Sequence, residues 1–206
     1  MNTTAIRKIT GKNELSLIKE EVSSMLSRAF YADPNYCYMM PNNQKRLEQN
    51  KWWMKVLLTY GVMFGQVYAT EANDGAAIWL GPEKPYVDNF HICRLGLIAY
   101  PFIIGITNFL RMLKVVNTWG QLHKLEAANH MYLMVIGVEP DNQGKGTGKA
   151  LLEAVLTRAD QDKLPCYLET ATEKDVRFYE KNGFRVVIHD KVKNGPEYWT
   201  MRREPV

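Results

Sequence analysis

Three glycines at alternate positions, Gly144, Gly146 and Gly148, stand directly before an apolar pattern that is typical of a helix. Glycine has no Cβ atom, so successive backbone N–H groups in such a loop can turn toward one anion. A helix that begins there adds the positive end of its dipole and its unpaired N–H groups. The stretch therefore predicts a site for a phosphate or pyrophosphate group. The alternative is a turn that only allows a strand and a helix to pack closely.

Two common phosphate-binding motifs do not fit this stretch. A P-loop that ends at Gly148-Lys149 would need glycine at Gln143 and a hydroxyl at Ala150. The dinucleotide motif G-x-G-x-x-G, started at Gly144, would need glycine at Lys149. A nucleotide-binding protein is therefore the weaker interpretation, and another class of anionic ligand is favoured.

The residues on both sides of the loop resemble the signature of the GCN5-related N-acetyltransferase (GNAT) family. In that family a V-x-P strand end precedes the pattern Q/R-x-x-G-x-G/A, which is matched here by Val138, Pro140, Gln143, Gly146 and Gly148. The stretch "FYEKNGF" at 178–184 resembles the second recurrent motif of the family. With "WTMRR" near the C-terminus, the chain is most similar to puromycin N-acetyltransferase-like members, over about residues 130–203.

The resemblance implies an α/β (α+β) fold, with a mixed, mostly antiparallel central sheet and helices on both faces. It also implies a splayed strand pair that holds acetyl-CoA, the co-substrate of the family. The glycine loop would bind the pyrophosphate, and the preceding strand would bind the pantetheine arm. An isolated strand glycine often marks a bulge, so we expect one at Gly137. The residues assigned to acetyl-CoA are Ile136, Gly137, Val138, Gln143, Gly144, Lys145, Gly146, Thr147, Gly148 and Lys149.

Acyl transfer from a thioester to an amine needs a base, donors for the oxyanion and an acid for the leaving thiolate. The backbone N–H of Ile136 or Val138 is the natural oxyanion donor. Tyr179 matches the general acid of the family, and the alternative is a ring packed on the sheet with its hydroxyl satisfied locally. Many members carry Asn where this chain has Thr172, so the contact that this Asn makes with the pantetheine or the thiol is not expected here.

Glu169 is the candidate base. Side chains alternate along "CYLET", so Cys166 and Leu168 share one face while Tyr167 and Glu169 share the other. A carboxylate in an otherwise apolar strand costs free energy unless it has a partner or a task. The two interpretations are a base, acting directly or through water, and a salt-bridged carboxylate at the end of the sheet.

The elements that position these residues follow from apolar spacing and turn residues. Helices are predicted over 15–30, 44–60, 95–127, 150–159 and 175–182. Hairpins are predicted from "GQVYATEA" to "GAAIWLG" and from "FRVVIHD" to "EYWTMRR". Buried strands are predicted in "HMYLMVIGVEP" and "PCYLET", and a loop is predicted in "YADPNYCYMMPNN". We interpret residues 1–206 as one domain, with a donor-binding core at about 130–203 and a helical insert on the acceptor side at about 90–127.

The acceptor site is predicted outside the donor motif. Phe30, Asp33 and Tyr36 are the proposed substrate residues, with Asp33 pairing with the incoming ammonium or serving only as a turn residue. The segments 30–42 and 95–110 are aromatic and aliphatic, which favours a small amine with an apolar body. The pocket would be built from Phe30, Tyr31, Tyr36, Tyr38, Met39, Met40, Tyr100 and Phe102.

The composition excludes several other classes. The net charge is +4 with no dense Lys/Arg run, which does not favour nucleic acid. The four histidines show no metal-ligand spacing, and the three cysteines form no cluster, which fits reduced thiols in the cytoplasm. The apolar segment from Leu95 to Leu110 is shorter than the ~20 residues of a spanning helix and contains Pro101 and Gly105. It predicts a buried helix pair, with a loose contact to a membrane surface as the alternative.

These observations together predict a cytoplasmic N-acetyltransferase. It would transfer the acetyl group of acetyl-CoA directly to a primary amine of a small molecule. The alternative within the same fold is a catalytically weak sensor or scaffold that binds acyl-CoA.

Overall fold

The computed structural model describes residues 4–87, 89–126 and 129–206. The first half contains β1 (Ile6–Ile9), α1 (Lys12–Ala29), α2 (Pro34–Met39), α3 (Asn43–Phe64), β2 (Gln66–Thr70) and β3 (Gly75–Leu80). An insert follows, with α4 (Asn89–Arg94), a 3₁₀ turn (Leu97–Ala99), α5 (Tyr100–Ile104) and α6 (Ile106–His123). The second half contains β4 (Met131–Val138), a 3₁₀ turn (Pro140–Asn142), α7 (Thr147–Gln161), β5 (Cys166–Thr170), α8 (Glu173–Glu180), β6 (Arg185–Lys191) and β7 (Glu197–Arg203).

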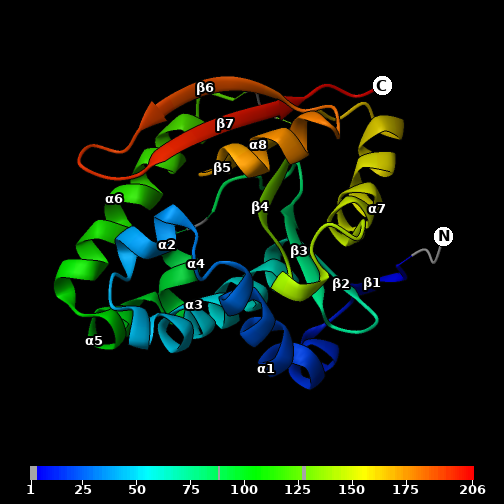
Figure 1. Cartoon of the computed structure of the whole chain (residues 1–206). Coiled ribbons are helices and arrows are strands. Elements are labelled where there is room, and N and C mark those ends of the chain that lie inside the picture. Colours follow the sequence, from blue (N-terminus) through cyan, green and yellow to red (C-terminus); the bar gives the residue numbers. More distant parts are fainter. Residues whose placement is uncertain (1–3, 88, 127–128) are drawn as a thin grey trace.

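The described strands form one sheet in the order β1-β2-β3-β4-β5-β7-β6 (Figure 1). The β4–β5 pair is parallel, and the other neighbours in the sheet are antiparallel. Helices cover both faces, with α1 and α3 on one side and α7 and α8 on the other. The predicted mixed, mostly antiparallel α/β fold is therefore confirmed.

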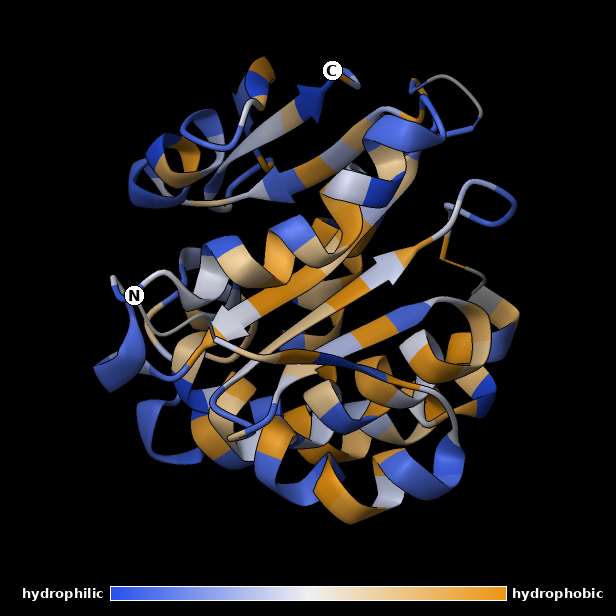
Figure 2. Ribbon diagram, turned by 90° about the vertical axis from the view of Figure 1, so that its right-hand side faces the viewer, coloured by the Kyte–Doolittle hydropathy of each residue, from blue (hydrophilic) through white to orange (hydrophobic). Residues whose placement is uncertain are grey.

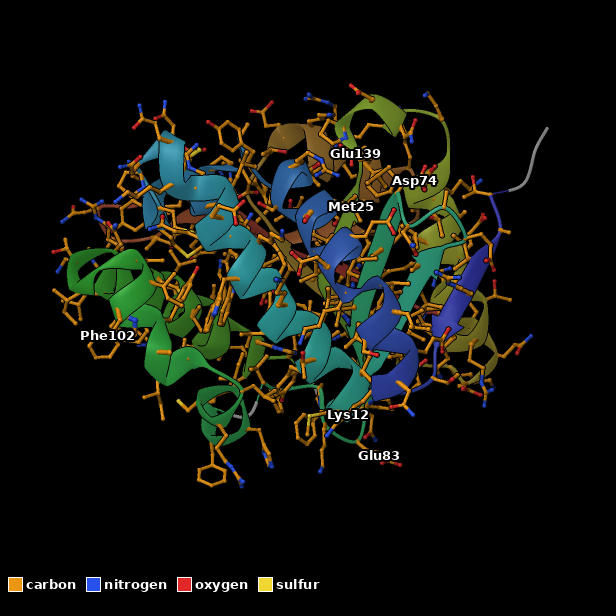
Figure 3. The ribbon with its side chains drawn as sticks, turned by 90° about the horizontal axis from the view of Figure 1, so that it is seen from below. Lys12, Met25, Asp74, Glu83, Phe102 and Glu139 are labelled. Atoms are coloured by element: carbon orange, nitrogen blue, oxygen red, sulfur yellow. The ribbon has the colours of Figure 1, made fainter. Side chains whose placement is uncertain are left out.

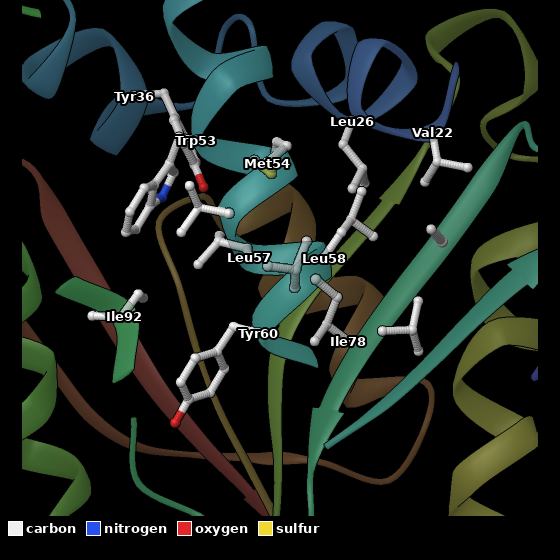
Figure 4. Close-up of a cluster of buried hydrophobic side chains, with 14 of the residues drawn as sticks. Val22, Leu26, Tyr36, Trp53, Met54, Leu57, Leu58, Tyr60, Ile78 and Ile92 are labelled. Atoms are coloured by element: carbon white, nitrogen blue, oxygen red, sulfur yellow. The ribbon is translucent and has the colours of Figure 1, made fainter. Parts of the chain in front are cut away.

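Apolar side chains decide which strands lie in the middle of the sheet. Every residue of β3 is buried, and the central strands appear as hydrophobic ribbons between two helical layers (Figure 2). Val22 and Leu26 of α1 meet Met54 and Leu58 of α3 above Ile78 of β3 (Figure 4). On the other face, α7 and α8 enclose a second cluster around Trp79, Leu151 and Met201. Each face of the sheet thus carries its own hydrophobic core.

The sequence-based boundaries needed three corrections. The edge strand β1 was not predicted, because four residues give too short an alternation. The predicted loop after Phe30 contains α2, in which the Asp33 carboxylate accepts hydrogen bonds from the N–H groups of Asn35 and Tyr36. Pro34 therefore starts this helix and does not break one. The segment 95–110 forms a helix pair that is interrupted at Gly105 (φ 84°), but the pair is not buried as predicted, since Phe102 and Ile106 are 90 and 63% exposed.

The strands β4 and β5 diverge soon after they pair. Met131, Tyr132 and Leu133 pair with Cys166, Tyr167 and Leu168. Beyond these three pairs β4 continues along β3 to Val138, while β5 continues along β7 to Thr170. In the described part of the chain the pair is therefore a V that opens toward the C-terminal ends of both strands, as Figure 1 shows.

The bulge of β4 lies at Met134, so the prediction that Gly137 marks it was wrong. The β3–β4 register shifts between Ile78 and Trp79, opposite Met134. Gly137 pairs in register with Ala76. A Cβ atom at Gly137 would lie 2.7 Å from Cδ2 of Leu26, because α1 crosses the strand there. The glycine therefore allows close packing of helix and strand.

Candidate active site

Glu169 lies at the apex of the V. It is the first residue of β5 beyond the parallel pairs, and it remains tied to Thr200 of β7. Its side chain projects to the same face as Tyr167, as the alternation predicted. Tyr132, which pairs with Tyr167, brings a second phenol to this carboxyl group. The base candidate thus lies between two aromatic side chains where the strands separate.

Burial determines the chemistry of this carboxyl. It raises the pKa of Glu169 to about 8, and the phenols of Tyr132 and Tyr167 partly oppose the rise. Neither Oε1 of Glu169 nor the hydroxyl of Tyr167 has a hydrogen-bond partner of normal geometry among the described residues, although both atoms are buried. Burial therefore outweighs the two phenols, of which Tyr132 is the stronger partner. No salt bridge to Glu169 occurs in the described part of the chain, so the salt-bridge interpretation is not supported.

Tyr179 lies on the opposite face of the sheet from Glu169. It belongs to α8 and packs in the cluster beside α7, in ring contact with Phe178 and Phe184. Burial, together with the charges of Asp175 and Asp33, raises the pKa of its phenol well above the usual value. Asp33 belongs to the other face, at the start of α2.

The three predicted substrate residues, Phe30, Asp33 and Tyr36, lie close together, beside the part of β4 that contains Gly137. The rings of Phe30 and Tyr36 are 5.1 Å apart, and a Cβ atom at Gly137 would lie 3.3 Å from the Phe30 ring. Burial raises the pKa of Asp33 to about 6, while the N–H groups that it caps oppose the rise. Asp33 therefore remains mostly ionised at neutral pH. The carboxylate serves as a helix cap and also places a negative charge beside Tyr36 and Tyr179.

The larger aromatic pocket predicted from the segments 30–42 and 95–110 does not form. Phe102 is 90% exposed and points away from the protein. Tyr100 is buried between the rings of Trp52 and Trp53, with centroid distances of 5.0 and 5.3 Å. The sequence gives the hydrophobicity of these residues, but it does not give the side of each short helix on which they lie.

The glycine loop has the backbone that its composition predicted. Gly144 and Gly146 have φ angles of 77° and 94°, which side-chain-bearing residues rarely adopt. No atom lies within 4 Å of the Cβ position at either glycine. Gly146 is the N-cap of α7, and no side chain caps the helix there. The first N–H groups of α7 thus face a loop whose inner side is free of side chains.

Two contacts hold the loop in place. The Gln143 side chain donates to the carbonyl of Val138, and the ammonium of Lys174 donates to Gln143 Oε1 at 3.0 Å. A hollow of about 410 Å³ borders the loop on the side of Thr70, Asp74 and Lys145. Gly148 is close to Phe178, since a Cβ there would lie 3.2 Å from that ring. The loop is therefore fixed to both β4 and α8.

Thr172 has a structural task in place of the usual Asn. Its hydroxyl caps α8 by accepting from the N–H of Asp175 at 3.1 Å, and it lies 2.5 Å from Asp175 Oδ2. These two contacts engage the hydroxyl at the start of the helix that carries Tyr179. The residue positions that helix.

A buried histidine pair was not predicted from the sequence. The Nε2 atoms of His123 and His130 are 2.7 Å apart, and the His123 ring stacks on Tyr167 with a centroid distance of 5.0 Å. Burial, and then the neighbouring His130, lowers the pKa of His123 to about 3. The pair supports the tyrosines beside Glu169. Its spacing carries no sequence signal, because the chain leaves α6 and returns into β4 between the two histidines.

Neither a metal nor a cysteine nucleophile is indicated in the described residues. They contain no group of three or more side chains suited to hold a metal ion. Cys166 is buried, and burial raises the pKa of its thiol to about 12. A hollow of about 580 Å³ lies near the N-terminal end of β4, between Phe64, Pro82 and Tyr86. None of the predicted site residues lines it.

Comparison with known proteins gives this site its class. Residues 118–205 match the family model of the acetyltransferase (GNAT) domain. An uncharacterized N-acetyltransferase of Schizosaccharomyces pombe is 27% identical over 172 residues, which cover 80% of this chain and 70% of that protein.

Two solved structures share the fold. One is from Corynebacterium glutamicum and is described as histone acetyltransferase HPA2 and related acetyltransferase. It has a TM-score of 0.65 at 17% identity and covers 98% of this chain and 97% of its own. The other is a Drosophila melanogaster polyamine N-acetyltransferase, with a TM-score of 0.62 at 14% identity, covering 97% and 100%.

The protein is an acyltransferase: residues 118–205 match the acetyltransferase (GNAT) domain, and the chain shares the fold of the solved acetyltransferases. This fold uses acetyl-CoA as the acetyl donor. The particular likeness to puromycin N-acetyltransferase and the division into one domain with an acceptor-side insert stay predictions.

Replacing Gly146 tests whether the loop holds the donor. A valine at φ 94° is strained, and its side chain would fill the space beside the first N–H groups of α7. We expect Gly146→Val to weaken CoA binding by about tenfold or more, which corresponds to about 1.4 kcal/mol, measured by calorimetry.

Gly105→Val is the matched control. Gly105 has φ 84° and no atom within 4 Å of its Cβ position, but it lies outside the loop. Its variant should be strained to a similar degree and should still bind CoA. Equal losses in the two variants, or none in Gly146→Val, would show that the loop does not hold the pyrophosphate.

Proposed function

We propose that this enzyme transfers the acetyl group of acetyl-CoA directly to a primary amine of a small molecule with an apolar or aromatic body. The observation that carries the proposal is the buried carboxyl of Glu169 at the point where β4 and β5 separate, with the buried phenol of Tyr179 on the opposite face of the sheet. One face of the sheet then offers a base and the other face an acid. A thioester inserted between β4 and β5 would lie between them.

The residues around the V fit acetyl-CoA. The left-handed glycines leave the inner side of the loop open, and α7 begins there without a side-chain cap, which suits a pyrophosphate. Beyond Leu133, β4 lacks strand pairing on the side of β5 within the described residues. A pantetheine arm can therefore make strand-like hydrogen bonds along this edge, with Ile136 and Val138 as partners. The carbonyl of the thioester then reaches a β4 N–H that stabilises the oxyanion.

The base step belongs to the face that carries Glu169. The carboxylate takes a proton from the incoming ammonium, and the free amine attacks the thioester carbonyl carbon. A pKa of about 8 brings this carboxyl close to neutral pH, where a general base works most efficiently. Burial between Tyr132 and Tyr167 raises the pKa of the carboxyl to this value.

The acid step belongs to the opposite face. When the carbon–sulfur bond breaks, the sulfur receives the proton of the Tyr179 hydroxyl and leaves as the thiol. The second proton of the attacking nitrogen returns to the Tyr179 oxygen, and the proton on Glu169 goes to solvent. The ammonium and the thioester therefore give the amide, the thiol and one proton that is released to solvent.

The acceptor preference rests on Phe30, Tyr36 and Asp33. Two rings in contact, with an ionised carboxylate beside them, favour an ammonium group attached to an apolar body. The Drosophila relative is described as acting on polyamines, which is a precedent for a small amine on this fold. The Corynebacterium structure bears a histone acetyltransferase description, so a basic peptide is the acceptor to exclude.

An acceptor screen tests this preference. Phenethylamine, tryptamine, aminoacyl-nucleoside compounds of the puromycin type, spermidine and a lysine-rich peptide would be compared by release of the CoA thiol. We expect the aromatic amines, with the puromycin-type compounds, to give the highest kcat/KM. Turnover of the peptide without turnover of the aromatic amines would contradict the preference. CoA binding without thiol release from any acceptor would favour the sensor alternative.

The pH dependence of kcat/KM tests Glu169. The base must be ionised, so activity should rise with pH through an inflection near pH 8. Phenethylamine suits this test because its alkylammonium titrates well above pH 8, so the acceptor stays protonated through the inflection and needs the base. We expect Glu169→Gln to remove the inflection and to lower kcat/KM by about 10²-fold. Glu48→Gln, at an exposed position on α3, is the control and should keep the wild-type profile.

The substitution Tyr179→Phe tests the acid. It removes one hydroxyl and keeps the ring against Phe178 and Phe184, so thermal stability should change little. We expect kcat to fall by about 10²-fold while the affinity for acetyl-CoA is nearly unchanged. Tyr68→Phe, which removes a hydroxyl from β2, serves as the control. Wild-type turnover of the Tyr179→Phe enzyme would return this side chain to a packing role.

A further inference from the structure

The insert carries a row of exposed apolar side chains that the proposed reaction does not use. Ile98 of the 3₁₀ turn, Phe102 of α5, and Ile106 and Leu110 of α6 are 69, 90, 63 and 59% exposed. We call them the insert row. Single exposed apolar residues are common on proteins, but a row of this kind marks a contact surface.

The buried side of the insert is already satisfied. Tyr100 is fully buried between Trp52 and Trp53, and its hydroxyl contacts the carbonyl of Gln49 at 3.3 Å. Ile104 is 4% exposed, and Met112 and Val115 bury the inner side of α6. The buried residues anchor one side of the insert to the protein, and the insert row therefore lies on the side that is exposed. Figure 3 shows Phe102 at the periphery of the molecule, far from Lys12 at the start of α1.

Positive charge surrounds this face without negative charge of its own. Residues 89–125 include Arg94, Arg111, Lys114 and Lys124, and no Asp or Glu. Arg94 precedes Ile98 by four residues, and Lys114 follows Leu110 by four. The ammonium of Lys114 donates to the carbonyl of Lys193, which brings the cationic β6–β7 turn beside α6. The apolar row is thus flanked by cations at both ends.

We propose that the insert row is a peripheral docking site for a membrane surface that contains anionic lipids. Apolar side chains on short helices, flanked by Arg and Lys, suit the boundary between headgroups and acyl chains. Among the described residues no helix is long and apolar enough to cross a membrane. A second copy of this chain fits less well, because a symmetric contact would bring the same cations together.

Vesicle co-sedimentation tests the proposal with the full chain. The probes are vesicles of phosphatidylcholine alone and vesicles with about one third phosphatidylserine. We expect the wild-type protein to bind the anionic vesicles preferentially, and added salt to weaken the binding. The double variant Phe102→Asp/Ile106→Asp should lose about tenfold or more of the bound fraction. Arg94→Ala/Lys114→Ala should reduce the preference for anionic vesicles.

Leu17→Asp is the matched control, because Leu17 is 84% exposed on α1 and lies outside the insert row. It should bind vesicles as the wild type does. A thermal shift with CoA shows that each variant is folded. The proposal is overturned if the wild type binds neither kind of vesicle, or if the double variant binds as well as Leu17→Asp. It is also overturned if sedimentation detects a dimer that Phe102→Asp/Ile106→Asp dissociates, since the row would then join two copies.

Discussion

The short parallel pairing of β4 and β5 is the constraint on which the rest of the structure depends. After three residue pairs the two strands follow different neighbours, β3 and β7. The bulge at Met134 turns β4 at this point, and Met134 and Val135 both pack toward the face of α1 and α3. A sheet that stayed paired here would satisfy its own backbone and leave no edge for a ligand.

The same divergence explains why opposite properties meet at one point. Glu169 leaves the paired region still enclosed by Tyr132 and Tyr167. Burial there raises the pKa of its carboxyl to about 8. Tyr179 and Asp33 belong to opposite faces of the sheet, and the charge of Asp33 adds to the rise in the pKa of the Tyr179 phenol. The candidate base and the candidate acid are therefore positioned by elements on both faces of the sheet, where β4 and β5 separate.

Local sequence signals predicted most of the fold and the backbone of the glycine loop. Alternating glycines before an apolar helix gave the loop at 144–148, and strand alternation gave the face of Glu169. The failures were positions where tertiary packing decides. Gly137 is required by the approach of α1, and Phe102 is turned outward because Tyr100 is taken between two tryptophans. The His123–His130 contact joins two elements whose relative placement no local pattern reports.

The brevity of the β4–β5 pairing also has a mechanical consequence. Strands β5, β7 and β6 form a block whose backbone ladder to the other strands consists of three residue pairs, supplemented by side-chain packing and by the Arg203–Asp160 ion pair with α7. Such a block is suited to behave as a separate cooperative unit, with its own opening free energy in hydrogen exchange. Acetyl-CoA bound between β4 and β5 would contact both units and so raise the free energy of opening one against the other.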